Sequence, residues 1–581
     1  MRAGSGVKSA VTVITQRSLL KDFFLRQWCV AVCLVLATLV ANVSLILIPI
    51  LIGRYYDLAF GAATFRARLL ERLGVALPDT PNGVIALCGV VILTHAVFVF
   101  AERFGARYLG ETMARQIRES LFAALIEAPL GVFDRKSVGK LLSRFAGDAR
   151  AIQRLVTIGI VRWAGDILLI AAILALLATL HPQLTLVLAS SAPIALGAVL
   201  LFNRRLRTRG KKLRGAQSNM LVFVTSRLQG ILSVKVWNRQ ASEKNALNKA
   251  ARKLLRRAMA YHLVDSLTAS LAVGLLYLML LAMAVLGSRP SLVEGTSSMT
   301  GGLLVAYVMI VLTAFPFFKR TLRVNAVWQK GRLSLDRVIA TLNQRSESAG
   351  RRKPLMVREW TIELRNVSFG YRPDEPVLDD LSCVFPGGAL TKIVGRNGSG
   401  KSSILKLILG LYTPSRGVIL VGGQDLAQCA PHSIRQWIAL VSPEAPLVGR
   451  TVCEAVSDGS DGSPNERIAS IVQRFHLLPI LDQASRPDYK IGELGRNLSA
   501  GQRTALMFVR AFLTNKPIVL LDEPFTGLDR ETRSHLWAVI AGMKGNKTVI
   551  LIDHGSDFDC DDEIDHTVIL TTRSERAGVV A

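Results

Sequence analysis

The sequence predicts a multi-domain membrane protein, in which an all-α domain of six spanning helices with long helical extensions precedes an α/β domain. Half of the 581 residues are hydrophobic, and nearly all the long apolar runs precede residue 357. Residues 1–357 carry 47 Lys and Arg against 16 Asp and Glu, whereas residues 358–581 carry 24 against 27. The formal charge of +28 therefore belongs to the apolar part, which is typical of basic loops beside a membrane and not of a nucleic-acid-binding protein.

Six apolar stretches are long enough to cross a bilayer, which takes about 20 residues per helix. They lie at residues 28–52, 83–101, 160–180, 183–202, 263–287 and 302–318, within a predicted membrane domain at 28–343. No small-residue cleavage site follows the first run, so we expect residues 1–27 to be retained, with Ser18–Trp28 forming a short helix on the membrane surface. A mitochondrial presequence is the weaker alternative.

Lys and Arg gather in two of the connections between these spans. Ten lie in residues 102–159 and sixteen in 203–262, while 181–182 and 288–301 hold one between them. Basic loops face the cytoplasm, so both termini and the α/β domain are predicted there, in a multi-pass protein of the cytoplasmic membrane. Because both basic segments have helical patterning and are too long for loops, we expect helices that leave the membrane, turn and return.

Few ionisable residues lie inside the spans. Burying a charge in a membrane costs free energy, so such residues are candidates for lining a cavity. The clearest are Asp166 and His95. Each also has a purely structural interpretation. Asp166 would form an ion pair with Arg162 one turn earlier, and His95 would be a neutral, hydrogen-bonded histidine in the core. The seven cysteines form no CxxC pair and have no histidine cluster beside them, which argues against a zinc site.

Residues 344–357 are polar and contain Gly and Pro, so they are expected to link the membrane domain to an α/β domain at 358–575, with a tail at 576–581. The strongest motif of that domain is TKIVGRNGSGKSS, where a β-prone run, a glycine-rich turn and a helical run follow one another. Backbone N–H groups of such a turn hold phosphates, the lysine reaches the terminal phosphates, and the serine hydroxyl binds Mg²⁺. The residues expected at the nucleotide are Gly395, Arg396, Asn397, Gly398, Ser399, Gly400, Lys401, Ser402 and Ser403.

Two acidic residues follow a second apolar run, in PIVLLDEP. Four apolar residues predict a buried parallel strand, and ligands bind at the carboxyl ends of such strands. Asp522 is therefore expected to coordinate Mg²⁺ together with Ser402, directly or through water. Glu523 suits polarising the water that attacks the γ-phosphate.

Four further motifs give the chain a family resemblance. NLSAGQR resembles the signature motif of ATP-binding-cassette (ABC) proteins with one Gly replaced by Ala, and TGLD is similar to their D-loop. His554 resembles the switch histidine, and Tyr371 the aromatic residue that stacks on adenine. With six spans before one ATPase domain, the chain resembles exporter-type ABC half-transporters over essentially its whole length. The resemblance implies that Glu523 and His554 are catalytic and that ATP is also contacted by Tyr371, Ser499, Ala500, Gly501, Gln502 and Asp529.

One position departs from that family. A glutamine ordinarily ends the strand that IALVS resembles and joins Mg²⁺ to the transmembrane helices, but Pro443 stands there, followed by Glu444. Proline cannot bind a metal. Glu444 is the candidate to replace the glutamine as an Mg²⁺ ligand, at the cost of repulsion from Glu523 and the phosphates unless the metal neutralises it.

The resemblance also implies a mechanism. ATP would lie between the phosphate loop of one subunit and the signature motif of the other, so the chain must dimerise, most simply as a homodimer. Closure would move helical tips near 133–140 and 215–235 and open a cavity outward. The expected activity is export of a hydrophobic, amphipathic or peptidic compound, with a peptide or natural-product antibiotic favoured. The alternatives are a flippase for a lipid or lipid-linked precursor, a non-transporting membrane regulator or channel gated by ATP, and an importer.

Overall fold

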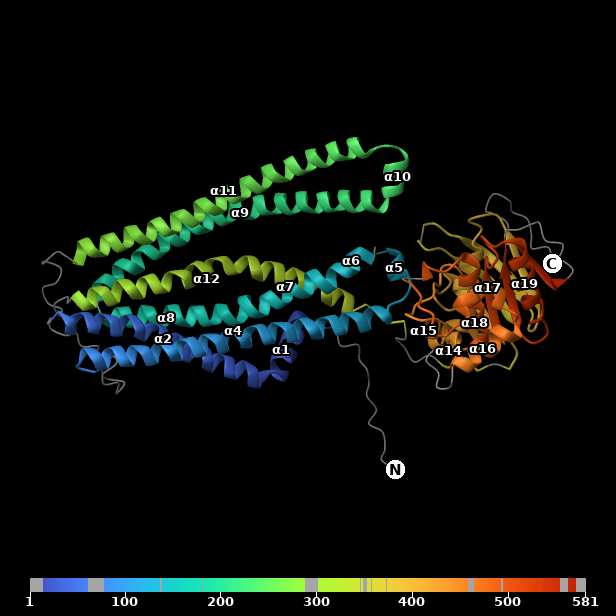
Figure 1. The fold of residues 1–581 in the computed structure, drawn as a ribbon, viewed down its shortest axis with the longest axis horizontal. Helices are drawn as coiled ribbons and strands as arrows, with labels where there is room; N and C mark the ends of the chain where they lie inside the picture. The colour runs from blue at the N-terminus through green and yellow to red at the C-terminus, as the bar shows by residue number, and fades with distance from the viewer. Residues whose placement is uncertain are drawn as a thin grey trace, which may run out of the picture. The chain divides into compact units, whose positions relative to one another are not determined.

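Figure 1 shows the fold in the computed structural model, which describes residues 14–60, 78–135, 138–180, 182–287, 301–344, 346–347, 353–356, 358–372, 374–457, 464–492, 495–553 and 563–570. The chain forms two compact units. The first comprises Met1–Phe122 and Leu142–Asn343, and the second comprises Ala123–Leu141 and Gln344–Ala581. The second unit therefore combines an α/β domain with a short segment from the helical part of the sequence.

The first unit is built from helices. Their bounds are α1 (Gln16–Arg26), α2 (Trp28–Ala59), α4 (Pro81–Ile126), α6 (Val138–Ser143), α7 (Ala149–Arg154), α8 (Trp163–Leu180), α9 (Pro182–Gln229), α10 (Ile231–Val236), α11 (Gln240–Gly287) and α12 (Gly301–Leu342), with α4 and α6 crossing the boundary between the units. Two π-helical turns, Arg144–Asp148 and Leu155–Arg162, connect α6, α7 and α8. The short helix expected before the first span is present as α1.

Within the part of the chain that the structure describes, five helices are long and apolar enough to cross a membrane. They are Trp28–Ala59, Pro81–Ile126, Leu141–Leu180, Gln240–Leu281 and Gly301–Leu342. They overlap five of the six predicted spans, and the sixth span, 183–202, lies in α9, where most side chains fall outside the described set.

The expected helical extensions are confirmed. Helix α4 has 46 residues and α9 and α11 have 48 each, which at 1.5 Å per residue gives about 70 Å, more than twice the length that a bilayer core requires. Helices α9 and α11 run side by side, and α10 joins the pair at one end (Figure 1).

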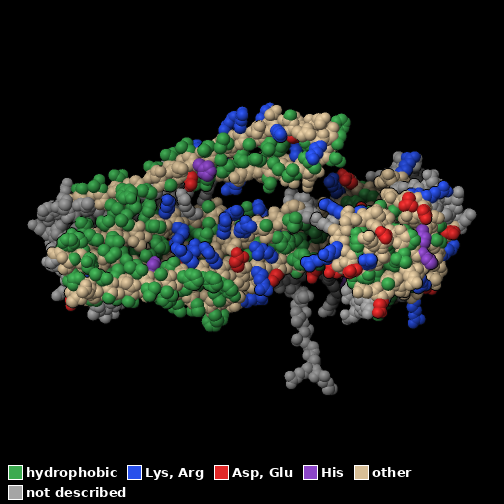
Figure 2. Space-filling model, in the orientation of Figure 1, with side chains coloured by type: hydrophobic (Ala, Val, Ile, Leu, Met, Phe, Trp, Pro, Cys, Tyr) green, Lys and Arg blue, Asp and Glu red, His purple; other side chains and the backbone are tan. Residues whose placement is uncertain are grey.

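Helix α12 organises the core of the first unit, because it packs against both α2 and α8. Its Tyr307 and Ile310 are buried with Ile50 of α2 and Leu169 of α8. Large apolar side chains such as Leu93 remain exposed on the outer faces, which is typical of helices that face lipid. Figure 2 shows apolar side chains covering one end of this unit and Lys and Arg side chains gathered farther along it.

The second unit contains two sheets. The antiparallel sheet has the order β2-β1-β4-β5, from β1 (Ile362–Phe369), β2 (Leu378–Phe385), β4 (Arg416–Val421) and β5 (Gln424–Asp425). The parallel sheet has the order β6-β7-β8-β3-β9, from β3 (Leu390–Gly395), β6 (Ile438–Val441), β7 (Ile518–Asp522), β8 (Thr548–Ile552) and β9 (His566–Leu570). Helices of this unit are α5 (Gly131–Arg135), α13 (Lys401–Ile408), α14 (Pro431–Arg435), α15 (Val452–Val456), α16 (Pro464–Arg474), α17 (Leu478–Leu481), α18 (Ala500–Leu513) and α19 (Arg530–Ala541).

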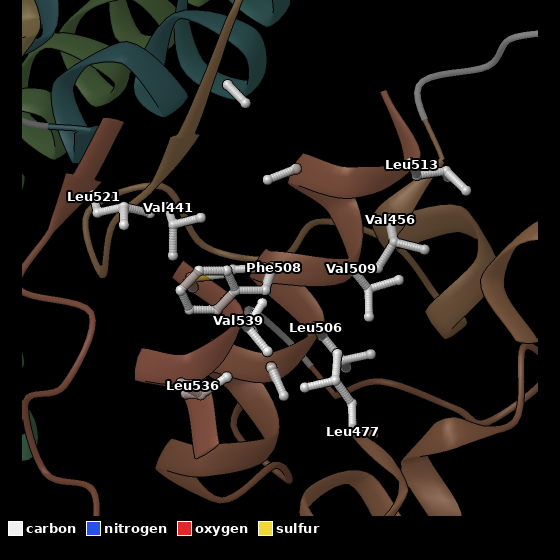
Figure 3. Packing of buried hydrophobic residues seen from close by; sticks show 14 of the residues in the cluster. Val441, Val456, Leu477, Leu506, Phe508, Val509, Leu513, Leu521, Leu536 and Val539 are labelled. Atoms are coloured by element: carbon white, nitrogen blue, oxygen red, sulfur yellow. The ribbon is translucent and has the colours of Figure 1, made fainter. Parts of the chain in front are cut away.

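The parallel sheet is buried on both faces, as its continuous apolar strands require. Side chains alternate along β7, so Val519 and Leu521 join the cluster formed by α18 and α19, while Ile518 and Leu520 join the cluster that contains α13. Figure 3 shows the first of these clusters around Phe508 of α18, with residues of α19 and of the strands nearby. The alternation places the next residue, Asp522, on the face covered by α13.

Candidate functional site

The phosphate-loop motif forms the turn between β3 and α13. Gly398 and Gly400 have φ angles of +82° and +95°, which L-residues rarely adopt, and Gly400 caps the N-terminus of α13. A Cβ at Gly400 would lie 2.6 Å from Leu378 Cδ2. Lys401 is buried, and its Nζ donates to the carbonyl oxygens of Gly395 at 2.7 Å and Arg396 at 3.0 Å. The expected strand, tight turn and helix are thus present, and the Lys401 ammonium group lies against the carbonyl groups of the loop.

The loop also holds an unsatisfied hydroxyl group. Ser399 Oγ is buried and has no hydrogen-bond partner among the described residues. A Cβ at Gly395 would lie 2.7 Å from this oxygen, so the hydroxyl group points inward across the turn. Buried hydroxyl groups without a partner are rare in folded proteins. Because phosphate oxygens accept such hydrogen bonds, the loop fits a nucleotide phosphate.

Asp522 lies at the carboxyl end of β7, facing the first turn of α13. Its Oδ1 accepts a hydrogen bond from Ser402 Oγ at 3.2 Å, and its Oδ2 accepts one from Ser442 Oγ at 3.3 Å. Burial raises the pKa of Asp522, and the two hydroxyl groups partly offset that rise. A carboxylate and a hydroxyl oxygen side by side form a donor set that suits Mg²⁺, so two of the three residues predicted as metal ligands, Ser402 and Asp522, lie together.

Glu523 follows at the same edge of the sheet in a left-handed conformation, with φ of +49°. Its N–H donates to the carbonyl oxygen of Ile552 at 2.9 Å, which ties this turn to the end of β8. Thr526 Oγ1 donates to Glu523 Oε2 at 3.3 Å. Burial lowers the pKa of Lys401, and the charges of Glu523 and Asp522 oppose that shift. The lysine and both acids therefore belong to one electrostatic site.

Tyr371, expected to stack on adenine, comes soon after β1 and is partly exposed. Its hydroxyl group is 3.1 Å from Ser403 Oγ on α13. Its ring lies edge-on to Tyr412 with the centroids 5.3 Å apart, and Lys406 Nζ is 5.8 Å from the centroid of Tyr371. These contacts hold the ring beside the phosphate loop.

The signature motif begins α18. Ser499 caps the helix, since its Oγ accepts from the N–H of Gln502 and the Gln502 side chain accepts from the N–H of Ser499, both at 3.1 Å. Ser499 and Ala500 are exposed. A Cβ at Gly527 of the TGLD segment would lie 3.9 Å from Ala500 Cβ, so the two motifs adjoin. Asp529 caps α19 by accepting from the N–H of Thr532 at 2.8 Å.

Pro443 stands where the family has a glutamine, and the residue that follows it, Glu444, contacts α13. Glu444 Oε2 lies 2.8 Å from Lys406 Nζ, so its carboxylate pairs with α13 five residues beyond Lys401. The N–H of Glu444 donates to Ser442 Oγ at 3.2 Å. Sequence reasoning missed Lys406, Ser442 and Tyr412, because none belongs to a recognisable motif. His554, the expected switch histidine, lies outside the described residues.

Inside the spans, the expected partner of Asp166 is wrong. Asp166 is buried and pairs with two of the three guanidinium nitrogens of Arg320 from α12: Nε lies 2.6 Å from Oδ2, and Nη2 donates to Oδ1. Arg162, the local candidate, ends a π-helical turn, whose wider spacing changes which residues share a face. His95 Nδ1 lies 3.0 Å from the carbonyl oxygen of Ala41 on α2, which confirms the interpretation of a hydrogen-bonded histidine.

Comparisons with known proteins agree with the fold. Residues 31–315 match the family model of the ABC transporter transmembrane region, and residues 378–526 match that of the ABC transporter. The chain is 27% identical over 469 residues to an ATP-dependent lipid A-core flippase of Haemophilus influenzae, covering 80% of this chain and 79% of the relative. It is 25% identical over 473 residues to a protein of the same name from Salmonella paratyphi A, covering 81% of each.

A solved structure of a bacterial Atm1-family ABC exporter with ATP bound superposes with a TM-score of 0.77 at 20% identity, covering 93% of each chain. The two family matches follow the order of the two parts of the chain, and the phosphate loop and Asp522 lie within the second match. The chain belongs to the ABC transporters, as a half-transporter that joins one exporter-type transmembrane region to one ATPase domain and couples ATP hydrolysis to transport.

Proposed function

We propose that this half-transporter acts as a homodimer in the cytoplasmic membrane and uses ATP to move an amphipathic lipid across it. The observation that carries the substrate class is the agreement among relatives matched over most of their length. Relatives at 24–27% identity, covered over about 80% of their length, are named ATP-dependent lipid A-core flippases. Those names do not support the peptide cargo that the sequence favoured, so the lipid alternative takes its place.

The ATP site supplies the driving reaction. In this proposal Lys401 and the loop N–H groups bind the β- and γ-phosphates, Tyr371 stacks on adenine, and Ser402 and Asp522 hold Mg²⁺. The ion offsets the negative charge of the phosphates. Glu523 polarises the attacking water, and His554 is assigned to the same step by resemblance alone.

The exposed signature motif supports the proposed homodimer. Ser499 and Ala500 lie at the solvent-facing N-terminus of α18, where the helix adds positive potential for a phosphate bound by a second subunit. Identical subunits would complete two equivalent ATP sites. The cytoplasmic placement of both termini and of the ATPase domain rests on the basic segments 102–159 and 203–262.

Substrate-stimulated ATPase activity tests the lipid assignment. The purified full-length protein is reconstituted in vesicles of neutral phospholipid, and ATP turnover is measured with added lipid A, with lysophospholipid, and with a hydrophobic peptide. We expect lipid A to stimulate turnover and the peptide to leave it at the basal rate. Stimulation by the peptide alone would reject the lipid while leaving ATP-driven export in place.

The variant Glu523→Gln provides the control for the ATP site. General-base catalysis contributes about 100-fold or more, so turnover should fall by at least that factor while nucleotide binding is kept. Glu531→Gln, on the first turn of α19, is the matched exposed substitution and should keep the wild-type rate. If substrate movement persisted in Glu523→Gln, the chain would be a channel gated by ATP instead of a pump.

A further inference from the structure

A buried serine lies beside the predicted metal ligand Asp522 and has no assigned role. Strands β6 and β7 are parallel neighbours with Val441 opposite Leu521, so Ser442 and Asp522, one residue later, lie at the same edge of the sheet. Ser442 Oγ donates to Asp522 Oδ2 at 3.3 Å. Ser442 is 2% exposed and Asp522 is 8% exposed, so water has little access to this hydrogen bond. A hydrogen bond shielded from water is stronger than one at the surface.

The two oxygens of the Asp522 carboxylate have different partners. Oδ1 accepts from Ser402 Oγ at 3.2 Å on the first turn of α13, whereas Oδ2 accepts from Ser442. A carboxylate held at one oxygen can still rotate about its Cβ–Cγ bond, but one held at both oxygens cannot do so freely. Ser442 therefore restricts the orientation of the carboxylate that faces Ser402.

Pro443 shapes the turn that holds Ser442 in place. The N–H of Ala445 donates to the carbonyl oxygen of Ser442 at 3.0 Å, and the N–H of Glu444 donates to Ser442 Oγ at 3.2 Å. Proline is favoured at the second position of such a turn because its ring fixes φ, and serine is favoured at the first. The Ser442 hydroxyl thus accepts from the turn and donates to Asp522, which sets its direction.

Glu444, the candidate metal ligand of the sequence, is paired with a different group. Its Oε2 lies 2.8 Å from Lys406 Nζ, and its side chain is 64% exposed. Moving this carboxylate to the metal would break the ion pair and would bring a further negative charge close to Asp522 and the phosphates. The ion pair with Lys406 therefore favours a metal site without Glu444.

We propose that Ser442 is a positioning residue of the Mg²⁺ site, which compensates for the missing glutamine by holding the carboxylate of Asp522, and that Glu444 is not a metal ligand. Residues that hydrogen-bond to metal ligands typically change metal affinity by about 10- to 100-fold when they are removed. The proposal rests on the Mg²⁺ site assigned above to Ser402 and Asp522, and it is independent of the transported substrate.

The contribution of the metal to nucleotide binding tests this role without measuring turnover. The full-length protein in lipid nanodiscs is titrated with a fluorescent ATP analogue, once with Mg²⁺ and once with EDTA, in the Glu523→Gln background that prevents hydrolysis. The dissociation constant in EDTA divided by that in Mg²⁺ gives the metal factor, which is a coupling between the two ligands. We expect Ser442→Ala to lower the metal factor by about tenfold, and Glu444→Gln to leave it at the parental value.

Two other serines provide controls. Ser402→Ala removes a predicted ligand and should also lower the metal factor. Ser433→Ala removes a buried hydroxyl group that bonds to the backbone of Leu355 and Ala430, so the metal factor should stay parental even if stability falls. A parental metal factor in both Ser402→Ala and Ser442→Ala would reject the metal site itself. A parental value in Ser442→Ala alone would overturn only the role of Ser442.

A double-mutant cycle determines whether Ser442 acts through Asp522. Asp522→Asn removes the negative charge and should lower the metal factor, and adding Ser442→Ala should lower it no further. A second tenfold loss in the double variant would overturn the positioning role, because Ser442 would then act without Asp522. A loss of similar size in Glu444→Gln would overturn the exclusion of Glu444 from the metal site.

Discussion

Alanine substitutions at three glycines with positive φ angles test the geometry of the phosphate loop, because each adds a single methyl group. Gly398, Gly400 and Gly423 all have φ near +80° to +95°, but their surroundings differ. A Cβ at Gly400 would lie 2.6 Å from Leu378 Cδ2, whereas a Cβ at Gly398 or Gly423 would meet nothing within 4 Å. Gly423 lies in the β4–β5 hairpin and not in the phosphate loop. Gly398→Ala therefore tests backbone strain in the phosphate loop, and Gly400→Ala adds a steric conflict to that strain. Gly423→Ala tests the same strain outside the loop.

The magnitudes follow from these surroundings. A left-handed conformation costs a non-glycine residue about 1–2 kcal/mol. Forcing a methyl group against Leu378 adds about 1–3 kcal/mol, so Gly400→Ala carries a total of about 2–5 kcal/mol. A loop that relaxes to relieve this strain must regain its original conformation before it can bind phosphate. The free energy of that change is lost from binding, and each 1.4 kcal/mol lowers the affinity about tenfold. We expect ATP affinity to fall by about 5- to 30-fold in Gly398→Ala and by about 30-fold or more in Gly400→Ala.

Equilibrium titration with a fluorescent ATP analogue measures these changes. The variants are prepared in the Glu523→Gln background so that nucleotide is not consumed, and thermal unfolding is recorded in parallel. Gly423→Ala should lower the unfolding temperature as much as Gly398→Ala does, without weakening ATP binding. Equal affinities in Gly398→Ala and Gly400→Ala would refute the steric argument, and a weakened affinity in Gly423→Ala would refute the assignment of the loop.

Three further predictions address other parts of the chain. Arg320→Met leaves the buried Asp166 unpaired and should destabilise the protein by about 3 kcal/mol, most of which Asp166→Asn in the same chain should restore in a double-mutant cycle of thermal unfolding. The hydrogen bond from Lys544 lowers the pKa of Asp565, so this carboxylate stabilises the fold above its unfolded-state pKa and loses that contribution as the pH falls through its folded-state pKa. Asp565→Asn should therefore show a smaller loss of unfolding temperature on acidification than the wild type. Ser499→Ala removes a helix cap worth about 1 kcal/mol and should suppress ATP turnover, measured by phosphate release, while binding of the ATP analogue persists.

Local sequence patterns were sufficient for the parts of the site that depend on neighbouring residues. The phosphate loop is a strand, a tight turn and a helix in immediate succession, so glycine spacing and apolar runs predict it directly. Side-chain alternation in β7 likewise places Asp522 opposite Ser402. The length and apolar composition of the runs likewise predicted five of the spans as helices, because these are also properties of neighbouring residues.

Contacts between distant segments could not be predicted in this way. Tyr412 and Asp134 are 278 positions apart, and only the packing of Ala123–Leu141 into the second unit brings them together. The partner of Asp166 was misassigned because one-turn spacing favours Arg162, whereas the π-helical turn and the packing of α12 favour Arg320. The Lys406–Glu444 ion pair lies outside every recognised motif, although the unusual Pro443 marked its neighbourhood.

The most direct test of ATP-driven lipid movement is a translocation assay. Proteoliposomes contain the full-length protein and a lipid A analogue with a fluorescent head group, and a membrane-impermeant quencher reports how much of the label lies in the outer leaflet. We predict that MgATP changes this fraction with the wild-type chain and leaves it unchanged with Glu523→Gln. Redistribution of the lipid without ATP, or equal redistribution by Glu523→Gln, would contradict it.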